Sequence, residues 1–350
     1  MYKPKILFYV ALACLWLAMG GCGKSTREET KSAATTQSES TFTNPIMENG
    51  ADPWVYKHTD GYYYYMATRG DRLTLWRSKS LPGISDGEQK TVWTPPDSGP
   101  NSSNIWAPEI HFLDGKWYIY YTAVDKEAPT DANRQVFVLE NNSSNPLTGD
   151  WIDRGAIETE YSGLDGSVFE FGGTRYYLYS AYKDGESVLN ISKMKNPWTL
   201  EGEESIIASP TYEWEKYEDR AICEAPQFLE LKQGKLGIVY SASACWDDYY
   251  ALGMLVASSD SDLMDPTSWS KLPEPVLQTS EENSVYGPGH CSFVTNDKGT
   301  DWIVYHAKKE ANGACRGRST RIQPFTWTKE GLPDFGVPAS LNREFTATDL

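Results

Sequence analysis

The sequence predicts an all-β chain folded as a five-bladed β-propeller, with four antiparallel strands per blade and an active site at the axial end of the central channel. A hairpin pattern recurs in segments that begin at Asp52, Ala107, Gly166, Ala225 and Gly289. Aligned on their turn glycines, the copies are spaced 54, 58, 61 and 65 residues apart, at Gly61, Gly115, Gly173, Gly234 and Gly299. Periods of about 40 to 50 residues are typical of propeller arrays, and longer loops account for the difference.

Each repeat contains four candidate strands. The first two form a hairpin, as in DPWVYKHTDGYYYYMAT from Asp52, where the second strand is aromatic. A third short apolar segment starts at Leu73, Val136, Ser187, Leu252 and Ser319. A tryptophan near turn residues then recurs at Trp93, Trp151, Trp198, Trp269 and Trp327. Four strands make one propeller blade, so the repeats predict five blades, with most of the aromatic residues filling the space between them.

Equivalent positions in radial blades converge on the propeller axis. At or just before the first strand of the copies lie Asp52, Glu109, Asp165, Glu224 and His290. Cleavage of a glycosidic bond needs one carboxylic acid that protonates the leaving oxygen and one carboxylate that activates water or attacks carbon. The axis can supply both from different blades. Carboxylates that meet there repel one another, which raises at least one pKa, so that one acid could stay protonated at neutral pH.

The N-terminal residues have the pattern of an export signal. Two lysines precede an apolar run of 14 residues from Ile6 to Met19, and two glycines and Cys22 follow. The run is short for a membrane span. We expect a signal peptide over residues 1–21, a flexible tether over 22–41 and the propeller over 42–350.

This N-terminal segment resembles a bacterial lipoprotein signal, in which the cysteine after the small residues becomes the lipidated first residue. The resemblance implies that Cys22 carries a lipid anchor, and that the protein is an exported lipoprotein of a Gram-negative periplasm or cell surface. The alternative is ordinary secretion with an incidental cysteine.

The charge of the chain narrows the choice of ligands. There are 32 basic and 48 acidic residues, which give a formal net charge of −16. Such a surface repels phosphate backbones and argues against nucleic acid, whereas neutral polymers remain open. The sequence contains neither a GxxxxGK[ST] phosphate loop nor an HExxH zinc motif. Tyrosine and tryptophan are abundant, at 22 and 13 residues, and favour both sheet packing and stacking on flat ligands.

Four cysteines follow Cys22. A hairpin centred on Gln233 and Gly234 places Cys223 nearly opposite Cys245, which makes a disulfide between these two plausible in an exported protein. Cys291 and Cys315 flank a shared central strand, at a separation of roughly 9 to 10 Å. We therefore expect the second pair to be free.

Five sequence blocks resemble family 43 of the glycoside hydrolases. They are GADPWV around Asp52, WAPE from Trp106, LDGS around Asp165, CEAP around Glu224 and GPGH ending at His290. The blocks occur in the order of the family, and the resemblance extends from Asn44 to about Gly336. It implies a five-bladed propeller and hydrolysis with inversion, in agreement with the blade count obtained from the repeats.

The resemblance also implies catalytic roles. Asp52 would be the general base that activates water, Glu224 the general acid, and Asp165 the residue that orients the acid and raises its pKa. For each of them the alternative is a turn or capping residue. Glu109 is interpreted mainly as structural.

Three further residues would surround the sugar. The resemblance places Trp106 in an apolar wall of the pocket, Arg321 near the acid and the substrate, and His290 near the central channel, where it would bind a cation through water. The alternatives are a core tryptophan, an interblade ion pair and a structural histidine. No cofactor would take part in the chemistry, and the ion, if present, would be a structural calcium with oxygen and water ligands.

The early blocks NPIMENGADPWV and NIWAPEIHFLDGKWYIYYTA look most like those of exo-acting arabinofuranosidases. The implied function is release of terminal α-L-arabinofuranosyl residues from arabinan or arabinoxylan-type plant polysaccharides, by an enzyme expected to be monomeric. Two alternatives remain: a β-D-xylosidase on the same scaffold, and a glycan-binding propeller without catalysis. The three carboxylates argue against the second, because binding alone needs no proton donor opposite a base.

Overall fold

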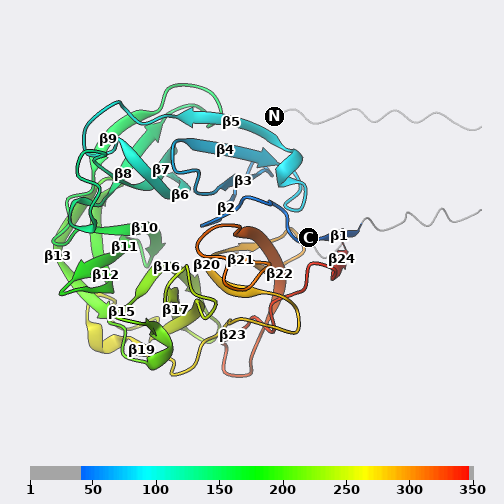
Figure 1. The fold of residues 1–350 in the computed structure, drawn as a ribbon. Helices are drawn as coiled ribbons and strands as arrows, with labels where there is room; N and C mark the ends of the chain where they lie inside the picture. Colours follow the sequence, from blue (N-terminus) through cyan, green and yellow to red (C-terminus); the bar gives the residue numbers. More distant parts are fainter. Residues whose placement is uncertain (1–40, 347–350) are drawn as a thin grey trace, which may run out of the picture. The chain divides into compact units, whose positions relative to one another are not determined.

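The computed structural model describes residues 41–346, and within them five four-stranded sheets are arranged around a central axis (Figure 1). In every sheet the strands pair antiparallel in chain order, with the first strand nearest the centre and the fourth at the rim. The predicted five-bladed propeller with four antiparallel strands per blade is therefore confirmed.

The strands of the blades have the following bounds. Blade 1 consists of β2 (Trp54–Lys57), β3 (Tyr63–Met66), β4 (Leu73–Ser78) and β5 (Glu88–Trp93). Blade 2 consists of β6 (Ser103–Leu113), β7 (Lys116–Val124), β8 (Gln135–Asn141) and β9 (Ile152–Ala156). Blade 3 consists of β10 (Gly163–Phe171), β11 (Thr174–Lys183), β12 (Glu186–Asn196) and β13 (Thr199–Ala208). Blade 4 consists of β16 (Cys223–Glu230), β17 (Lys235–Ala242), β18 (Ala251–Ser258) and β19 (Ser270–Lys271). Blade 5 consists of β20 (Tyr286–Thr295), β21 (Asp301–Lys308), β22 (Ser319–Trp327) and β23 (Pro333–Asp334).

Two small sheets and four short 3₁₀ helices complete the described chain. The sheets pair β1 (Thr41–Thr43) with β24 (Glu344–Thr346) and β14 (Lys216–Tyr217) with β15 (Arg220–Ala221). The helices are η1 (Ile84–Asp86), η2 (Asp131–Asn133), η3 (Glu213–Glu215) and η4 (Pro266–Ser268). No helix within residues 41–346 has the length and apolar character that a membrane crossing requires. The predicted signal peptide and the lipidation site at Cys22 lie outside the described residues, as does the tether except for Thr41.

The turn glycines that revealed the repeat have a common backbone conformation. Their φ angles are 79°, 77°, 79°, 68° and 83° at Gly61, Gly115, Gly173, Gly234 and Gly299. This left-handed region is open to glycine at little cost, because glycine lacks a Cβ atom. The recurrence of glycine at the tip of each first hairpin therefore has a local steric cause.

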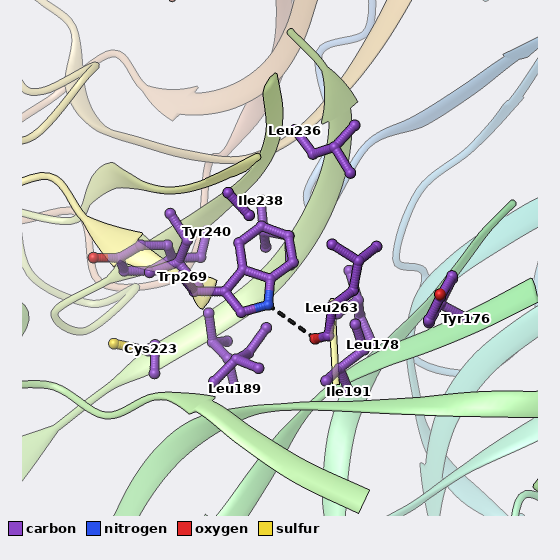
Figure 2. Packing of buried hydrophobic residues seen from close by; sticks show 14 of the residues in the cluster. Tyr176, Leu178, Leu189, Ile191, Cys223, Leu236, Ile238, Tyr240, Leu263 and Trp269 are labelled. Atoms are coloured by element: carbon purple, nitrogen blue, oxygen red, sulfur yellow. Dashed lines mark hydrogen bonds between the residues drawn. The ribbon is translucent and has the colours of Figure 1, made fainter. Parts of the chain in front are cut away.

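The recurrent tryptophans mark the start of the fourth strand in blades 2, 3 and 4 and pack in the spaces between blades. Trp269 immediately precedes β19 and lies in a cluster formed by blades 3 and 4 (Figure 2). Its indole nitrogen donates to the carbonyl of Leu263 at 3.0 Å, so the ring is buried without losing its hydrogen bond. Trp93 packs similarly against Tyr121 of the next blade, with ring centroids 5.0 Å apart.

Residues near the N-terminal end of the described chain complete blade 5. Ile46 and Met47 make backbone hydrogen bonds with Thr320 of β22, at 3.0 and 2.9 Å. The side chain of Asn44 bonds both the carbonyl and the amide of Ile322, each at 2.9 Å. The short strand β23 pairs only with the C-terminal end of β22, at Thr326 and Trp327. The N-terminal segment pairs with the other end of β22, near Thr320, and so closes the ring.

The disulfide assignment made from the sequence is wrong. Cys245 is bonded to Cys315, and Cys223 and Cys291 are buried free thiols. Cys223 lies opposite Ala242 in the β16–β17 ladder, because the hairpin is centred slightly earlier than expected and a register shift between Glu224 and Gln227 moves the pairing by one more residue. Cys245 lies beyond the paired strand, in a loop that turns toward the loop before β22.

Candidate active site

A cavity of about 450 Å³ lies where the first strands of the blades begin. All five blades contribute to its wall, through Asp52, Trp106, Asp165, Glu224 and His290. The three predicted catalytic carboxylates therefore share one cavity, although more than 50 residues separate each from the next.

The same unusual backbone conformation recurs at the entrance of each blade. At this point one non-glycine residue of each blade has φ between 44° and 56°: Asp52, Ala107, Asp165, Ala225 and His290. In blades 2 to 5 the pairing of the first two strands shifts register at this point, as in a β-bulge. A bulge redirects neighbouring side chains, and strained backbone of this kind is concentrated at functional sites.

The sequence suggested that the acids and the histidine at the axis occupy equivalent positions, and the register corrects this expectation. Asp52, Asp165 and His290 are equivalent positions, whereas Glu224 lies one residue before the bulged position of its blade and Glu109 two residues after it. Because neighbouring residues of a strand point to different sides, this offset gives Glu224 a direction of approach that differs from that of Asp52.

Side chains hold the amides of all five bulged residues. In four cases the acceptor lies seven residues after a turn glycine, in the second strand of the preceding blade or just beyond it. The bonds are Ala107 N to Thr68 Oγ1 at 2.7 Å, Asp165 N to Thr122 Oγ1 at 3.0 Å, His290 N to Ser241 Oγ at 2.8 Å and Asp52 N to His306 Nδ1 at 3.0 Å.

Blade 3 departs from this pattern in a way that involves the site. Its corresponding residue is Ser180, whose buried hydroxyl has no hydrogen-bond partner within residues 41–346. The amide of Ala225 donates instead to Oδ2 of Asp165, at 3.0 Å. Asp165 thus holds the peptide group that directly follows Glu224, which gives it a direct means of orienting that residue.

Asp52 is surrounded by groups that favour its ionised form. Arg318 Nη1 lies 2.6 Å from Oδ1, and the hydroxyl of Thr68 donates to Oδ2 at 2.6 Å. Nδ1 of His290 and Nδ1 of His306 each lie 3.4 Å from Oδ1. Burial opposes ionisation, but the nearby guanidinium of Arg318 outweighs it and holds the pKa of Asp52 well below its usual range.

His306 supports Asp52 as a neutral ring. Its Nδ1 accepts the amide proton of Asp52, so the ring proton is placed on Nε2. Burial and the nearby Arg318 lower the pKa of His306 to about 3. The contact between His306 and the carboxylate of Asp52 is therefore not an ion pair at neutral pH.

Glu224 and Asp165 have the opposite tendency. Burial, opposed in part by the hydrogen bond from Tyr250 to Oε1 at 2.8 Å, raises the pKa of Glu224 to about 7, and the charge of Asp52 adds to the increase. Burial and the charges of Glu224 and Asp52 raise the pKa of Asp165 well above its ordinary value. The pair therefore retains a proton near neutrality while Asp52 is ionised.

The predicted substrate-binding residues have different locations. Trp106 and His290 line the cavity, and the guanidinium of Arg134 lies 4.0 Å from the centroid of the Trp106 ring. Arg321 does not line it: its side chain is fully buried, and Nη2 donates to the carbonyl of Lys308 at 3.1 Å. The arginine that bonds the carboxylate of Asp52 is Arg318, three residues earlier in the chain.

Sequence reasoning missed several groups that line the cavity or bond its acids. They are Arg318, Tyr250, Thr68, Trp246 and the disulfide between Cys245 and Cys315. Trp246 lines the cavity with 41% of its surface exposed, which suits an aromatic platform at the mouth of the site. The only sequence signal for Arg318 was its proximity to Arg321. Arg318 lies just before β22 and contacts Asp52, whereas Arg321 lies within the strand and is buried away from the cavity.

The described residues do not build a direct cation site. Within residues 41–346 no group of three or more His, Cys, Asp or Glu side chains could hold a metal ion. The carboxylate of Glu109 is bonded by His111 at 2.9 Å and also by the side-chain amide of Gln227. Both oxygens of Glu109 therefore have protein partners.

The sequence model of glycosyl hydrolases family 43 matches residues 42–333. The chain belongs to this family. The family match accounts for the order of the acid-containing blocks and for the five blades, and it makes the chain a glycosidase scaffold whose chemistry needs no cofactor.

Several relatives of the chain carry arabinofuranosidase names. The chain is 40% identical over 348 residues to an extracellular exo-alpha-(1->5)-L-arabinofuranosidase of Streptomyces avermitilis, an alignment that covers 95% of this chain and 70% of the relative. It is 38% identical over 277 residues to an enzyme of the same name from Streptomyces chartreusis, with 77% and 83% covered. The solved structure of an alpha-L-arabinofuranosidase from Lactobacillus brevis is 37% identical, with a TM-score of 0.82 over 86% of this chain and 98% of that structure.

The family 43 fold also supports other specificities. The solved structure of a xylan beta-1,4-xylosidase from Bacillus halodurans is similar with a TM-score of 0.66, over 85% of this chain and 57% of that structure. At 19% identity this likeness concerns the fold alone. The shared architecture therefore does not select the sugar, which depends on the residues around the cavity.

Proposed function

We propose that this chain hydrolyses terminal α-L-arabinofuranosides of arabinan or arabinoxylan-type polysaccharides with inversion of the anomeric carbon. The observation that carries the proposal is the opposite protonation of carboxylates in one cavity. Asp52 is held ionised by Arg318, whereas Glu224 has a pKa of about 7 and is therefore mostly protonated below that pH. Inverting hydrolysis requires one carboxylate base and one carboxylic acid on opposite sides of the sugar.

The proposed step uses both groups at once. A water molecule attacks the anomeric carbon while Oδ2 or Oδ1 of Asp52 accepts a proton from it. The bond between the anomeric carbon and the leaving oxygen breaks, and Glu224 transfers its proton to that oxygen. Each turnover leaves Asp52 protonated and Glu224 ionised, and proton exchange with solvent restores both. Asp165 does not exchange protons with substrate in this scheme but fixes Glu224 through the amide of Ala225.

The names of the relatives support the choice of arabinofuranose, and the cavity wall suits a sugar in general. The relatives with 37 to 40% identity are named arabinofuranosidases, and two of them are named exo-acting. Trp106 and Trp246 offer apolar surfaces on the cavity wall, where sugar faces commonly stack. Trp106, His290 and Arg318 are proposed to contact the sugar bound next to the acids, in place of the Arg321 expected from the sequence.

The decisive experiment offers nitrophenyl α-L-arabinofuranoside and nitrophenyl β-D-xyloside side by side and follows the product anomer by NMR. We expect preference for the arabinoside and initial formation of the inverted anomer. A retained configuration would contradict the mechanism. Preference for the xyloside would replace the sugar assignment with the β-D-xylosidase alternative, and binding without cleavage of either would favour a glycan-binding propeller.

Substitution of the two acids tests the residue roles. Asp52→Asn and Glu224→Gln are each expected to lower turnover by at least about 10²-fold, because general base or general acid help is lost. Glu224→Gln should retain more activity on substrates with good leaving groups, which need little protonation. Near-normal rates in both folded variants would end the assignment.

The remaining proposals concern the surroundings of the enzyme. We infer a monomeric protein that is exported and anchored through Cys22, at the periplasmic or outer surface of a Gram-negative cell, with plant polysaccharide as its partner. The two Streptomyces relatives are named extracellular, which supports export. A calcium ion is proposed only as a structural ion that reaches His290 through water, and no step of the reaction passes through it.

A further inference from the structure

The disulfide between Cys245 and Cys315 joins two loops at the wall of the catalytic cavity. One loop, residues 243–250, connects β17 with β18, and the other, residues 309–318, connects β21 with β22. The cysteines are 70 residues apart in sequence, and both line the cavity. The bond therefore links two walls of the site.

The second loop contains the arginine that faces the proposed base. Nε of Arg318 donates to the carbonyl of Cys315 at 2.9 Å, while Nη1 contacts Oδ1 of Asp52 at 2.6 Å. The position of the guanidinium thus depends directly on the backbone of Cys315. This loop contains no strand, and its described attachments to the first loop are the disulfide and the bond from Asn312 N to Asp248 Oδ2 at 2.7 Å.

The first loop is held more firmly. Lys308, which is buried, bonds the carbonyl of Asp247 at 3.0 Å and the carboxylate of Asp248 at 2.8 Å. The carbonyl of Asp248 also accepts the amide of Gly287 at 3.1 Å. Tyr250, which donates to Glu224, is the last residue of this loop and is itself buried. Loss of the disulfide should therefore displace the Arg318 side of the cavity more than the Tyr250 side.

We propose that the Cys245–Cys315 disulfide is a positioning device for the general base, which holds Arg318 against Asp52 so that the base stays ionised in acidic solution. The inference rests on the proposed function, because it assumes that Asp52 acts as the base. Its consequence is largest for Asp52, which Arg318 contacts directly, whereas the acid Glu224 keeps its hydrogen bond from Tyr250 when the disulfide is absent.

The other groups around Asp52 determine the sign of the effect. They are His290 of β20, His306 of β21, Tyr65 of β3, Asp165 of β10 and Glu224 of β16. The two carboxyl groups repel a charge on Asp52, His306 is neutral because its pKa is lowered to about 3, and burial lowers the pKa of His290. Arg318 is therefore the permanent cation that offsets burial, and its displacement raises the pKa of Asp52.

The test compares the pH profile of kcat/KM for wild type with that of the double variant Cys245→Ser, Cys315→Ser, using nitrophenyl arabinofuranoside. We expect the acidic limb to move upward by about one pH unit or more, so that activity at a pH on the wild-type acidic limb falls by up to roughly tenfold while activity at pH 6.5 changes far less. The alkaline limb, which reports Glu224, should move in the same direction but by less, because the charge of Arg318 also lowers the pKa of Glu224 while the hydrogen bond from Tyr250 remains. Arg318→Ala should shift the acidic limb in the same direction, and adding it to the double variant should cause little further shift, because the two changes remove the same contact.

Dithiothreitol provides an independent measurement. The reagent transfers two electrons and two protons to the disulfide and closes to its own cyclic disulfide, leaving two thiols on the protein. Wild type should then acquire the profile of the double variant, while the double variant should not respond, since Cys223 and Cys291 are buried and already reduced.

The outcomes separate this inference from the proposed function. An unmoved acidic limb in folded protein that lacks the disulfide would overturn the positioning role, even if the melting temperature fell. The assignment of Asp52 would survive that result provided that Asp52→Asn remained inactive. An active Asp52→Asn variant would instead remove the proposed function and this inference with it.

Discussion

The opposite protonation of Asp52 and Glu224 depends on a few individual neighbours. Asp52 has the guanidinium of Arg318 at 2.6 Å. The largest charge effect on Glu224 comes instead from the carboxylate of Asp52, which raises the pKa of Glu224. Tyr250 moderates the result, because its hydrogen bond to Oε1 favours the ionised form of Glu224. The enzyme thus has a donor that limits how far the pKa of its acid can rise.

Tyr250→Phe is therefore expected to raise the pKa of Glu224. The proposed acid is active when protonated, so the alkaline limb of kcat/KM, which begins near pH 7, should move upward by roughly 0.5 to 1 unit. The measurement is a pH profile on nitrophenyl arabinofuranoside. Tyr240→Phe is the matched control, because Tyr240 is a buried residue of the same blade whose hydroxyl bonds Glu215 outside the cavity. A downward shift, or an equal shift in the control, would contradict the assigned role of Tyr250.

The left-handed residue at the start of each first strand, which forms a bulge in blades 2 to 5, is the structural element that builds the site. It gives Asp52, Asp165 and His290 the same backbone conformation and displaces Glu224 by one residue from that frame. Hydroxyl, imidazole or carboxylate groups hold each bulged amide, so the strained conformation is secured in every blade. The catalytic residues use a device that the scaffold repeats five times.

Thr68 and Ser180 are corresponding positions with different expected effects. The Thr68 hydroxyl donates to Asp52 and accepts the amide of Ala107, whereas the Ser180 hydroxyl has no hydrogen-bond partner within residues 41–346. We expect Thr68→Val to lower kcat about tenfold or more, and Ser180→Ala to change it less than about twofold. Steady-state kinetics of the two variants give the comparison. Equal losses would show that the hydroxyl position matters only for packing.

These elements also show what could be predicted from the sequence. The turn glycines, the aromatic second strands and the recurrent tryptophans have local causes, so they predicted the blades and placed Asp52, Asp165 and Glu224 at one axis. The displaced register at Cys223 and the choice of Arg318 over Arg321 depend on a bulge and on loop contacts between distant segments. No periodicity reports such contacts, and the disulfide and the arginine were therefore assigned incorrectly.

At alkaline pH the folded propeller contains an ionised Glu224 in its cavity, and this charge opposes folding. The pKa of Glu224 is raised from 4.5 to about 7, so its contribution to stability is fully present below about pH 4.5 and is lost as the pH rises through 7. At pH 8 the folded protein contains an ionised, partly buried carboxylate that the unfolded chain would solvate better.

Glu224→Gln should consequently gain stability relative to wild type as the pH increases. We expect its melting temperature to exceed that of wild type by about 2 °C or more at pH 8, with a smaller difference or none at pH 5. Thermal denaturation at both pH values is the measurement. Glu140→Gln is the opposite control: Lys116 and Arg154 bond Glu140 and its pKa is lowered despite burial, so that variant should be less stable at both pH values. A Glu224→Gln variant less stable than wild type at pH 8 would refute the argument.

The pairing of Asn44 with Ile322 has a consequence for biosynthesis. These two residues are 278 positions apart, and their hydrogen bonds help to close blade 5 onto the beginning of the domain. During translation the early segment must wait, unpaired, until the ribosome has delivered nearly the entire domain, because its partner strand does not yet exist. A nascent chain stalled before β22 would display open strand edges that invite chaperones or aggregation, so completion of synthesis and closure of the ring coincide.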